Sequence, residues 1–495
     1  MANESEKSPQ DYSPQTNAFK TLLNKVYFHR LPSYGNKIFY GLGFLALTCL
    51  VILAASGITM AFMGQSWWLH NPWGIYVRSV HLWTVQAFIA ILILHILVGF
   101  TTSGFRKPRR MVWVFGATIF CLALIQTEFG YGLRGDFSSQ FRAVSGADFW
   151  NGSYLGYWLN PLNYNQEFAL HVAIIPLAIF LLFIAHYLLE HTYGIAKPYR
   201  DDVKYKMVPA DHKVMYQRGV ALVGAILVLA FFFPSPYVKA ITISGISQQD
   251  PARVARNIFH EFNRTSDTAT YLDSIDPYTF DTRQVYVAIP YQKLAAAMGI
   301  KPNAWEEFSH ATPVQQALYT AQAKQYFSGT LASTTPPAVA HEATSTATST
   351  VANPVIAMIN TLMPAAQNGT YAAILNQENP SENYTYTLRF LNDMDLFEEK
   401  AKTLDMDTAQ WGMTKDETGS VWKLPPGSWW LTPLGAINST FNLLSNPYGD
   451  RDAAWGLGAL MLIFITFPYI PFLNRLPEAL HLAPLIWKTK EKEGE

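Results

Sequence analysis

The chain has 495 residues, with 36 basic and 36 acidic side chains, and therefore carries no formal net charge at pH 7. This balance argues against a nucleic-acid-binding protein, which needs an excess of basic residues. Only two cysteines occur, which excludes a disulfide scaffold, and no C-x-x-C-H sequence is present. Half of the residues are hydrophobic although the mean hydropathy is only +0.07, because the apolar residues are concentrated in a few runs.

Six apolar runs follow one another along the chain. Each has about the 20 residues that an α-helix needs to cross roughly 30 Å of hydrocarbon, and several contain almost no charged residue. We therefore predict an all-α integral membrane protein rather than a soluble protein with buried helices. The predicted transmembrane helices occupy residues 38–63, 77–100, 111–131, 168–190, 214–233 and 454–473.

The charges of the connecting loops predict how the chain is oriented. Residues 1–36 are polar and lack the pattern of a signal peptide. Two loops that fall on the same side as both termini are basic, and the positive-inside rule makes that side cytoplasmic. Residues 240–424 would then be extracytoplasmic, in a multi-pass protein of a prokaryotic cytoplasmic membrane. The basic residues are Arg106, Lys107, Arg109 and Arg110 in the first loop and Lys197, Arg200, Lys204 and Lys206 in the second.

The segment of residues 240–424 is a large polar insertion with 19 acidic and 12 basic residues. We expect a mostly helical or α+β domain that contains a Ser/Thr/Ala/Pro-rich linker at 328–354. The other predicted units are an N-terminal cytoplasmic segment (1–36), a bundle of four transmembrane helices (37–200), the fifth helix (201–239), and a C-terminal part with the sixth helix and a cytoplasmic tail (425–495).

Four histidines lie inside two predicted membrane helices, where an imidazole is costly and usually functional. His81 and His95 are 14 residues apart, and His171 and His186 are 15 apart. Fourteen residues make about four helical turns and span ~21 Å. The two histidines of one helix therefore face nearly the same way, at opposite depths in the membrane. Facing helices would pair His81 with His171 near the outer side and His95 with His186 near the inner side. Such pairs are typical of two bis-histidine haem sites.

The alternative is a set of hydrogen-bonded core histidines, which would not explain two pairs with matched spacing. Pro176 lies between the two histidines of the fourth helix and would bend it and absorb the extra residue.

Four glycines repeat the spacing of the histidines. Gly43 and Gly57 are 14 residues apart in the first helix, and Gly116 and Gly130 are 14 apart in the third. Glycine allows a flat macrocycle to approach the helix backbone closely. Glycines in membrane helices more often serve helix packing, but the shared period favours the walls of two haem sites.

These residues carry a family resemblance. Residues 30 to 200 resemble the cytochrome b/b6 family, the quinol-oxidising core of respiratory and photosynthetic bc complexes. The matching segments are NKIFYGLGFLALTCL, YVRSVHLWTVQAF, LHILVGFTTSGFRKPRRMVWVFG, EFGYGLRGD and LHVAIIPLAIFLLFIAHYLLEH. The resemblance includes all four histidines and all four glycines in order, and the spacing is closer to the b6 branch than to the mitochondrial one.

The resemblance implies further roles. Arg78 would pair with a propionate of the outer haem. His191 would touch the inner quinone, although an interfacial histidine near the lipid headgroups is an equal alternative. The family's inner-site aspartate has no clear match, and Asp211 is only a neighbour. The b6 branch attaches an extra haem through a cysteine at the position of Gly41, so we expect no covalent haem.

The C-terminal part departs from the family. The family's PEWY motif supplies a glutamate that takes a proton from quinol, whereas the counterpart here is LPPGSWWLTPL, with no carboxylate at that position. Trp429 and Trp430 of this segment are either part of the site or interfacial anchors. The family's GYxLPW also becomes GYGLRGD. Because quinol oxidation needs a base, either another acid such as Asp136 or one from the insertion replaces the glutamate, or water near Arg134 does, or the outer site does not oxidise quinol.

Taken with the resemblance, the sequence predicts the dihaem cytochrome b subunit of a bc-type quinol oxidoreductase, with two b-type haems and with quinone as substrate. The resemblance implies a Rieske iron–sulfur protein, a c-type cytochrome and a homodimeric complex in membrane lipid. One alternative is a membrane anchor and electron conduit for an extracytoplasmic oxidoreductase, in which quinone reacts only at the inner site. Another is a transporter or structural subunit without redox activity.

Overall fold

The computed structural model describes residues 30–196, 206–270, 280–299, 301–329, 353–378, 385–406, 414, 418–444 and 449–483. Within these residues the chain is mainly helical, and six helices are long and apolar enough to cross a membrane, as predicted. The chain is thus a multi-pass membrane protein. The spans are α2 (Leu42–Met63), α4 (Pro72–Thr101), α5 (Arg110–Gly132), the continuous α7, η4 and α8 (Tyr164–Ala169, Leu170–Ile174 and Ile175–Tyr193), α9 (His212–Phe232) and α23 (Gly449–Thr466).

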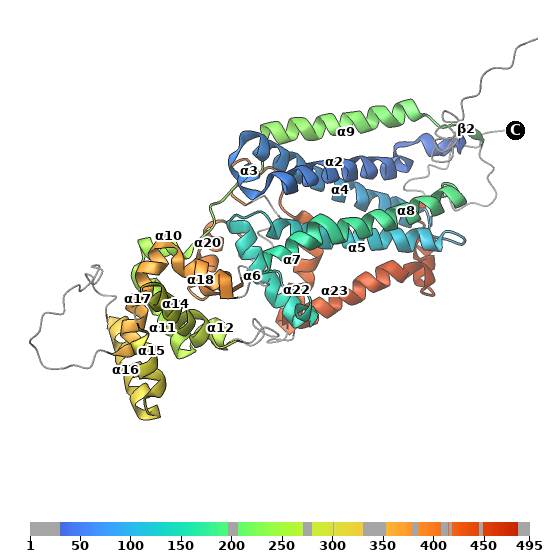
Figure 1. The fold of residues 1–495 in the computed structure, drawn as a ribbon. Coiled ribbons are helices and arrows are strands. Elements are labelled where there is room, and N and C mark those ends of the chain that lie inside the picture. Colours follow the sequence, from blue (N-terminus) through green and yellow to red (C-terminus); the bar gives the residue numbers. More distant parts are fainter. Residues whose placement is uncertain are drawn as a thin grey trace, which may run out of the picture.

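The first four spans form a bundle in which α2 packs along α4 and α5 packs along α8 (Figure 1). Helix α9 covers the side of α2 and α4, whereas α23 packs against α5 and the shorter helix α6 (Phe137–Gly152). Helix α4 begins where Asn71 accepts hydrogen bonds from two backbone amides of the first turn and Pro72 follows, a common N-terminal pattern.

The fourth span contains a π-helical turn, η4, directly before Pro176. A π turn holds one more residue than an α turn. The extra residue between His171 and His186 is therefore accommodated in this π turn, which contains His171 and ends two residues before Pro176.

The last span differs from its prediction. Helix α23 ends at Thr466 rather than near residue 473, because Pro468 lies in the 3₁₀ turn η8 (Phe467–Tyr469) that follows. A further helix, α22 (Thr432–Leu444), packs along α23 and was not predicted from the sequence.

The remaining elements around the bundle are short. They are β1 (Arg30–Pro32), η1 (Ser33–Asn36), η2 (Ile38–Tyr40), α3 (Gln65–His70), η3 (Leu155–Tyr157), β2 (Met207–Pro209), η7 (Trp429–Leu431), η9 (Leu473–Arg475) and α24 (Leu476–Ala479).

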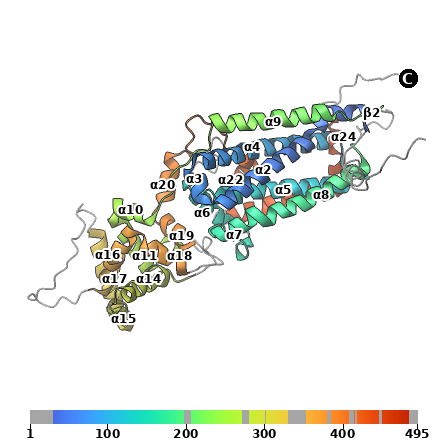
Figure 2. The same cartoon turned by 45° about the horizontal axis from the view of Figure 1, so that its top comes forward.

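The two ends of the bundle are different. At one end, β1 pairs antiparallel with β2, in the register that places Arg30 opposite Pro209. The described helices of residues 240–424 lie at the opposite end (Figures 1 and 2). We call the strand-bearing end the inner end and the other the outer end. Most of the predicted linker, and also Lys197, Arg200 and Lys204, lie outside the described residues.

Every described regular element of residues 240–424 is helical, so this segment is mostly helical rather than α+β. Together with α6, these helices form one apolar core that includes Phe137 of α6 and Phe262 and Leu362 of the insertion. The elements are α10 (Ile243–Gln249), α11 (Pro251–Asn263), α12 (Asp267–Thr270), η5 (Gln284–Ala288), α14 (Ile289–Ala297), α15 (Asn303–His310), α16 (Pro313–Gly329), α17 (Pro354–Asn368), α18 (Thr370–Glu378), α19 (Thr385–Asn392) and α20 (Leu396–Thr403).

Candidate functional site

The outer histidine pair joins α4 to η4. The ring centroids of His81 and His171 are 6.3 Å apart and the rings are inclined at 64°. His171 Nδ1 lies 2.9 Å from the backbone oxygen of Gln126, which can only accept a proton. His81 Nδ1 lies 2.8 Å from Ser56 Oγ, and that hydroxyl donates its own proton to the Ile52 carbonyl. Both Nδ1 atoms are therefore donors, which leaves each Nε2 with a lone pair for a ligand.

The inner pair has nearly the same ring geometry, between α4 and α8. The ring centroids of His95 and His186 are 6.4 Å apart, with the rings inclined at 73°. His186 Nδ1 donates to the Val112 carbonyl over 2.9 Å. The matched spacing thus brings together the two pairs that were expected from the sequence.

Each of the four glycines faces one histidine. A Cβ atom added to the glycine would meet the Cε1 atom of that ring at 2.6 to 3.6 Å. The glycine period therefore matches the histidine period because each glycine makes space for an imidazole. The facing residues are Gly43 and His95 (3.6 Å), Gly57 and His81 (3.3 Å), Gly116 and His186 (3.0 Å), and Gly130 and His171 (2.6 Å).

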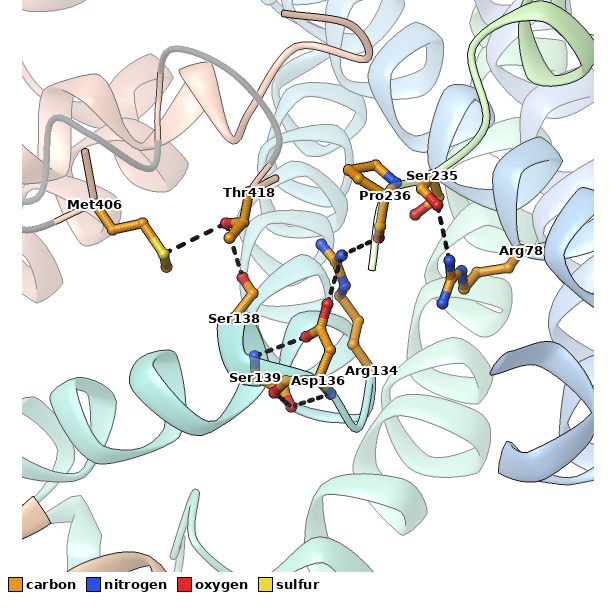
Figure 3. Close-up of polar contacts among 9 residues, drawn as sticks. All are labelled: Arg78, Arg134, Asp136, Ser138, Ser139, Ser235, Pro236, Met406 and Thr418. Atoms are coloured by element: carbon orange, nitrogen blue, oxygen red, sulfur yellow. Dashed lines mark hydrogen bonds and ion pairs between the residues drawn. The ribbon is translucent and has the colours of Figure 1, made fainter. Parts of the chain in front are cut away.

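A cavity of about 340 Å³ surrounds the outer pair. Its lining is mostly apolar, but Arg78 and Arg134, both buried, also line it. Arg78 donates from Nη2 to the Ser235 carbonyl over 2.8 Å, in the segment that follows α9 (Figure 3). Two cations beside an apolar cavity suit a flat apolar ligand that carries acidic groups.

Asp136, a predicted candidate base, is fully buried at the start of α6. Its Oδ1 accepts a hydrogen bond from the Ser139 amide over 3.1 Å, and its Oδ2 accepts one from Arg134 Nη2 over 2.8 Å (Figure 3). Arg134 also donates to the Pro236 carbonyl. Both carboxylate oxygens therefore have structural partners, in a helix cap and an ion pair.

The LPPGSWW segment packs against the bundle beside the cavity. Trp430 is 6% exposed and its indole nitrogen lies 3.2 Å from Oγ1 of Thr127, which lines the cavity. Trp429 donates to Gln86 Oε1 over 2.8 Å, and Gln86 donates in turn to the Pro426 carbonyl. Of the two predicted roles, burial of Trp430 among the helices favours part of the site over an interfacial anchor.

Sequence reasoning missed a buried charge cluster next to this segment. Arg142 of α6 donates to Ser428 Oγ over 3.2 Å, and its guanidinium lies 4.0 Å from the Tyr131 ring centroid. Glu128 and Glu167 line the same small pocket as Arg142. The signal in the sequence was a glutamate inside one apolar run and another directly before the next run, which is unusual for membrane helices.

The predicted inner-site residues lie at the opposite end of the bundle. His191 is half-buried near the end of α8, and its ring centroid is 6.1 Å from that of Tyr187. The neighbouring Glu190 forms an ion pair with Arg109. Asp211 caps α9 by accepting a hydrogen bond from the Val214 amide. An added Cβ at Gly41 would lie 3.7 Å from Arg218.

Comparisons with known proteins agree with this architecture. Residues 86–242 match the family model described as "Cytochrome b(N-terminal)/b6/petB". The chain is 30% identical over 192 residues to the cytochrome b6 of Heliobacterium modesticaldum, which covers 34% of this chain and 90% of that protein. The chain belongs to the cytochrome b/b6 family.

Two further cytochromes b6 give the same result. The cytochrome b6 of Heliomicrobium gestii is 29% identical over 192 residues (34% of this chain, 90% of that protein). That of Synechocystis is 29% identical over 184 residues (32% and 82%). A solved structure titled "Hyperthermophilic respiratory Complex III" aligns with a TM-score of 0.38 and 16% identity, covering 74% of this chain and 98% of that one. Family membership makes this chain a b-type haem protein of membrane electron transport.

Proposed function

We propose that the chain is the dihaem cytochrome b subunit of a bc-type quinol oxidoreductase. The observation that carries this proposal is the pair of matched histidine sites, each with opposed imidazoles and a glycine facing each ring. A metal–imidazole bond is about 2 Å long. The centroid separations of 6.3 and 6.4 Å would therefore fit two imidazoles that bind one iron through their Nε2 atoms.

The residues of the outer cavity fit a haem. Imidazoles held by Nδ1 donation are oriented and made more basic, and the apolar lining excludes water from a flat ring system. Arg78 would pair with an acidic group at the edge of that ring system. When bound, haem supplies reversible one-electron transfer at iron. The protein's part is to hold its edge, orient the imidazoles and keep the cavity dry.

In this proposal, the inner end is cytoplasmic and residues 240–424 are extracytoplasmic. The basic residues Arg106, Lys107, Arg109 and Arg110, which precede α5 and start it, support this orientation. The further expectations are a quinone site near His191, a Rieske iron–sulfur protein and a c-type cytochrome as partners, and a homodimeric complex. No ligands for iron–sulfur or c-type centres were found in the sequence, so such centres would belong to other chains.

Haem analysis of the purified protein tests the proposal. We expect two b-type haems per chain by a reduced-minus-oxidised spectrum and a haem assay. His81→Ala should remove the outer haem and His95→Ala the inner one, each leaving about one per chain. His310→Ala, in the insertion, is the matched control and should retain both. One haem or none in the wild-type chain, or two haems in both ligand variants, would contradict the proposal.

A second candidate is an electron conduit in which quinone reacts only at the inner end. The observation that favours it is the engagement of both Asp136 oxygens, together with the missing carboxylate in LPPGSWW. Quinol-driven haem reduction with and without an outer-site inhibitor separates the two candidates. Inhibition supports the bc-type function, whereas full insensitivity of an active protein supports the conduit.

A further inference from the structure

Three ionisable side chains meet between α5, α6 and α7 at the outer end. Glu128, Arg142 and Glu167 line one small pocket together with Gly132 and Trp150. Arg142 and Glu167 are each 4% exposed, whereas the Glu128 side chain is 33% exposed. Charged groups are rarely buried unless they are paired, so this cluster needs a chemical explanation.

The Glu167 carboxyl lies directly over the backbone of Gly132. A Cβ atom at Gly132 would overlap with both oxygens and with the carboxyl carbon. In the part of the chain that the structure describes, no hydrogen bond to this carboxyl is found. A carboxylate buried in this way requires either a proton or a nearby cation.

Arg142 is the cation of this pocket, and it carries only one positive charge for two carboxyl groups. Its Nη2 donates to Ser428, while Nε and Nη1 have no hydrogen-bond partner among the described residues. Nη1 lies 4.0 Å from Glu128 Oε2. One guanidinium can neutralise one carboxylate, so two glutamates with one arginine leave a place for one exchangeable proton.

The cluster borders the outer cavity. Tyr131 and Leu133, on either side of Gly132, line the cavity, and so does Phe168, next to Glu167. The Arg142 guanidinium covers the Tyr131 ring and contacts Ser428 of the LPPGSWW segment. The two stretches that depart from the family pattern therefore meet at this cluster.

We propose that Glu167, assisted by Glu128 and Arg142, is the proton acceptor for quinol that is oxidised at the outer end. The inference rests on the proposed quinol oxidation at this end. As an oxidised metal centre of the complex takes an electron from quinol, a quinol O–H bond breaks and a new O–H bond forms on the Glu167 carboxylate. The proton then leaves through Glu128, the more exposed acid. Two such cycles account for the two electrons and two protons of quinol.

The experiment compares Glu167→Gln with Glu398→Gln, a matched variant of an exposed glutamate in the insertion. Glu167→Gln should retain both haems but lower the rate of quinol-driven haem reduction about 10²-fold, a usual contribution of a general base. The carboxylic acid C=O band should also disappear from the redox-triggered infrared difference spectrum. Glu398→Gln should keep the wild-type rate and band.

An active Glu167→Gln variant with an unchanged carboxyl band would overturn this proposal alone. A wild-type protein without inhibitor-sensitive quinol oxidation would overturn the proposed function as well, so the two failures differ. If Glu167→Gln loses its haems, Gly132→Ala provides the test, because it keeps the acid but displaces it. Haem-loaded Gly132→Ala should show a shifted carboxyl band and a reduced rate, and wild-type values for both would contradict the proposal.

Discussion

The outer and inner ends of the bundle present the same histidine geometry in different chemical surroundings. The centroid separations of the two pairs differ by only 0.1 Å, being 6.3 Å and 6.4 Å. The outer pair adjoins a cavity with two buried arginines. At the inner end, by contrast, the ion pair of Arg109 and Glu190 is partly exposed. The repeated helix spacing thus produces two similar sites, while the buried charges distinguish the outer one.

The largest effect is expected from Gly130→Ala. Its Cβ would lie 2.6 Å from the His171 ring, which cannot easily move because Gln126 holds Nδ1. We expect the outer haem to be lost, with an overpacking cost of about 1–3 kcal/mol. Gly43→Ala at the inner end, where the contact is 3.6 Å, should retain both haems. Equal haem content in the two variants would contradict the assigned difference between the sites.

The second effect concerns the buried ion pair of the outer end. Asp136→Asn leaves the Arg134 charge buried without its counter-ion, and breaking a buried pair costs about 3–5 kcal/mol. Thermal unfolding followed by circular dichroism in detergent measures this loss. Asn retains a carbonyl oxygen for the cap, so a loss in this range reflects the charge, whereas an unchanged unfolding temperature would show that Arg134 has another adequate partner.

The third effect is a pH dependence of stability that arises in the insertion. Burial and the neighbouring Asp393 raise the pKa of Glu261 well above its ordinary value of 4.5, and burial also raises the pKa of Asp393. Glu261 Oε1 and Asp393 Oδ2 are buried without another partner in the described chain, so one shared proton satisfies both. Since the folded pKa is raised, this stabilisation is complete below about pH 4.5 and is lost as the pH rises through the folded-state value.

Unfolding temperatures of the wild type and Glu261→Gln across pH measure this dependence. The wild type should become less stable from acidic to neutral pH, and the variant should show a flatter profile because its amide does not titrate. Parallel profiles would rule out the shared proton.

The smallest effect is expected at the inner end. Glu190→Gln removes an ion pair whose side chains are 28% exposed for Glu190 and 13% for Arg109. Partly exposed pairs contribute about 0.2–1 kcal/mol, so the variant should unfold only slightly earlier than the wild type. A loss as large as that of Asp136→Asn would remove the contrast between the two ends.

Much of the bundle could be predicted from the sequence because its signals are periodic. Apolar length located the six spans, and the spacing of His81, His95, His171 and His186 placed them in facing pairs. The ligand role of the four histidines stays a prediction. The periodic signals act within a single helix, where rise and turn are fixed.

Other features depend on contacts between distant segments, so no local pattern indicates them. Arg142 meets Ser428 across 286 residues of chain, and Glu167 meets Gly132 from a different helix. Helix α22 escaped prediction because Asn438, Ser439 and Thr440 interrupt its apolar face. The π turn at His171 was partly predictable, because the histidine spacing of 15 residues, against 14 in the other helix, already showed that one extra residue had to be accommodated.

Helix α6 has a consequence for how the protein is built. Its Phe137 is a fully buried part of the apolar core of residues 240–424, while its Arg142 lies on the Tyr131 ring at the edge of the cavity. Helix α6 is therefore part of both the core of the insertion and the edge of the transmembrane bundle. Removing the insertion would expose Phe137 to solvent and make the position of Arg142, on the same helix, less rigid. The insertion therefore helps to hold the residues of the outer site in place.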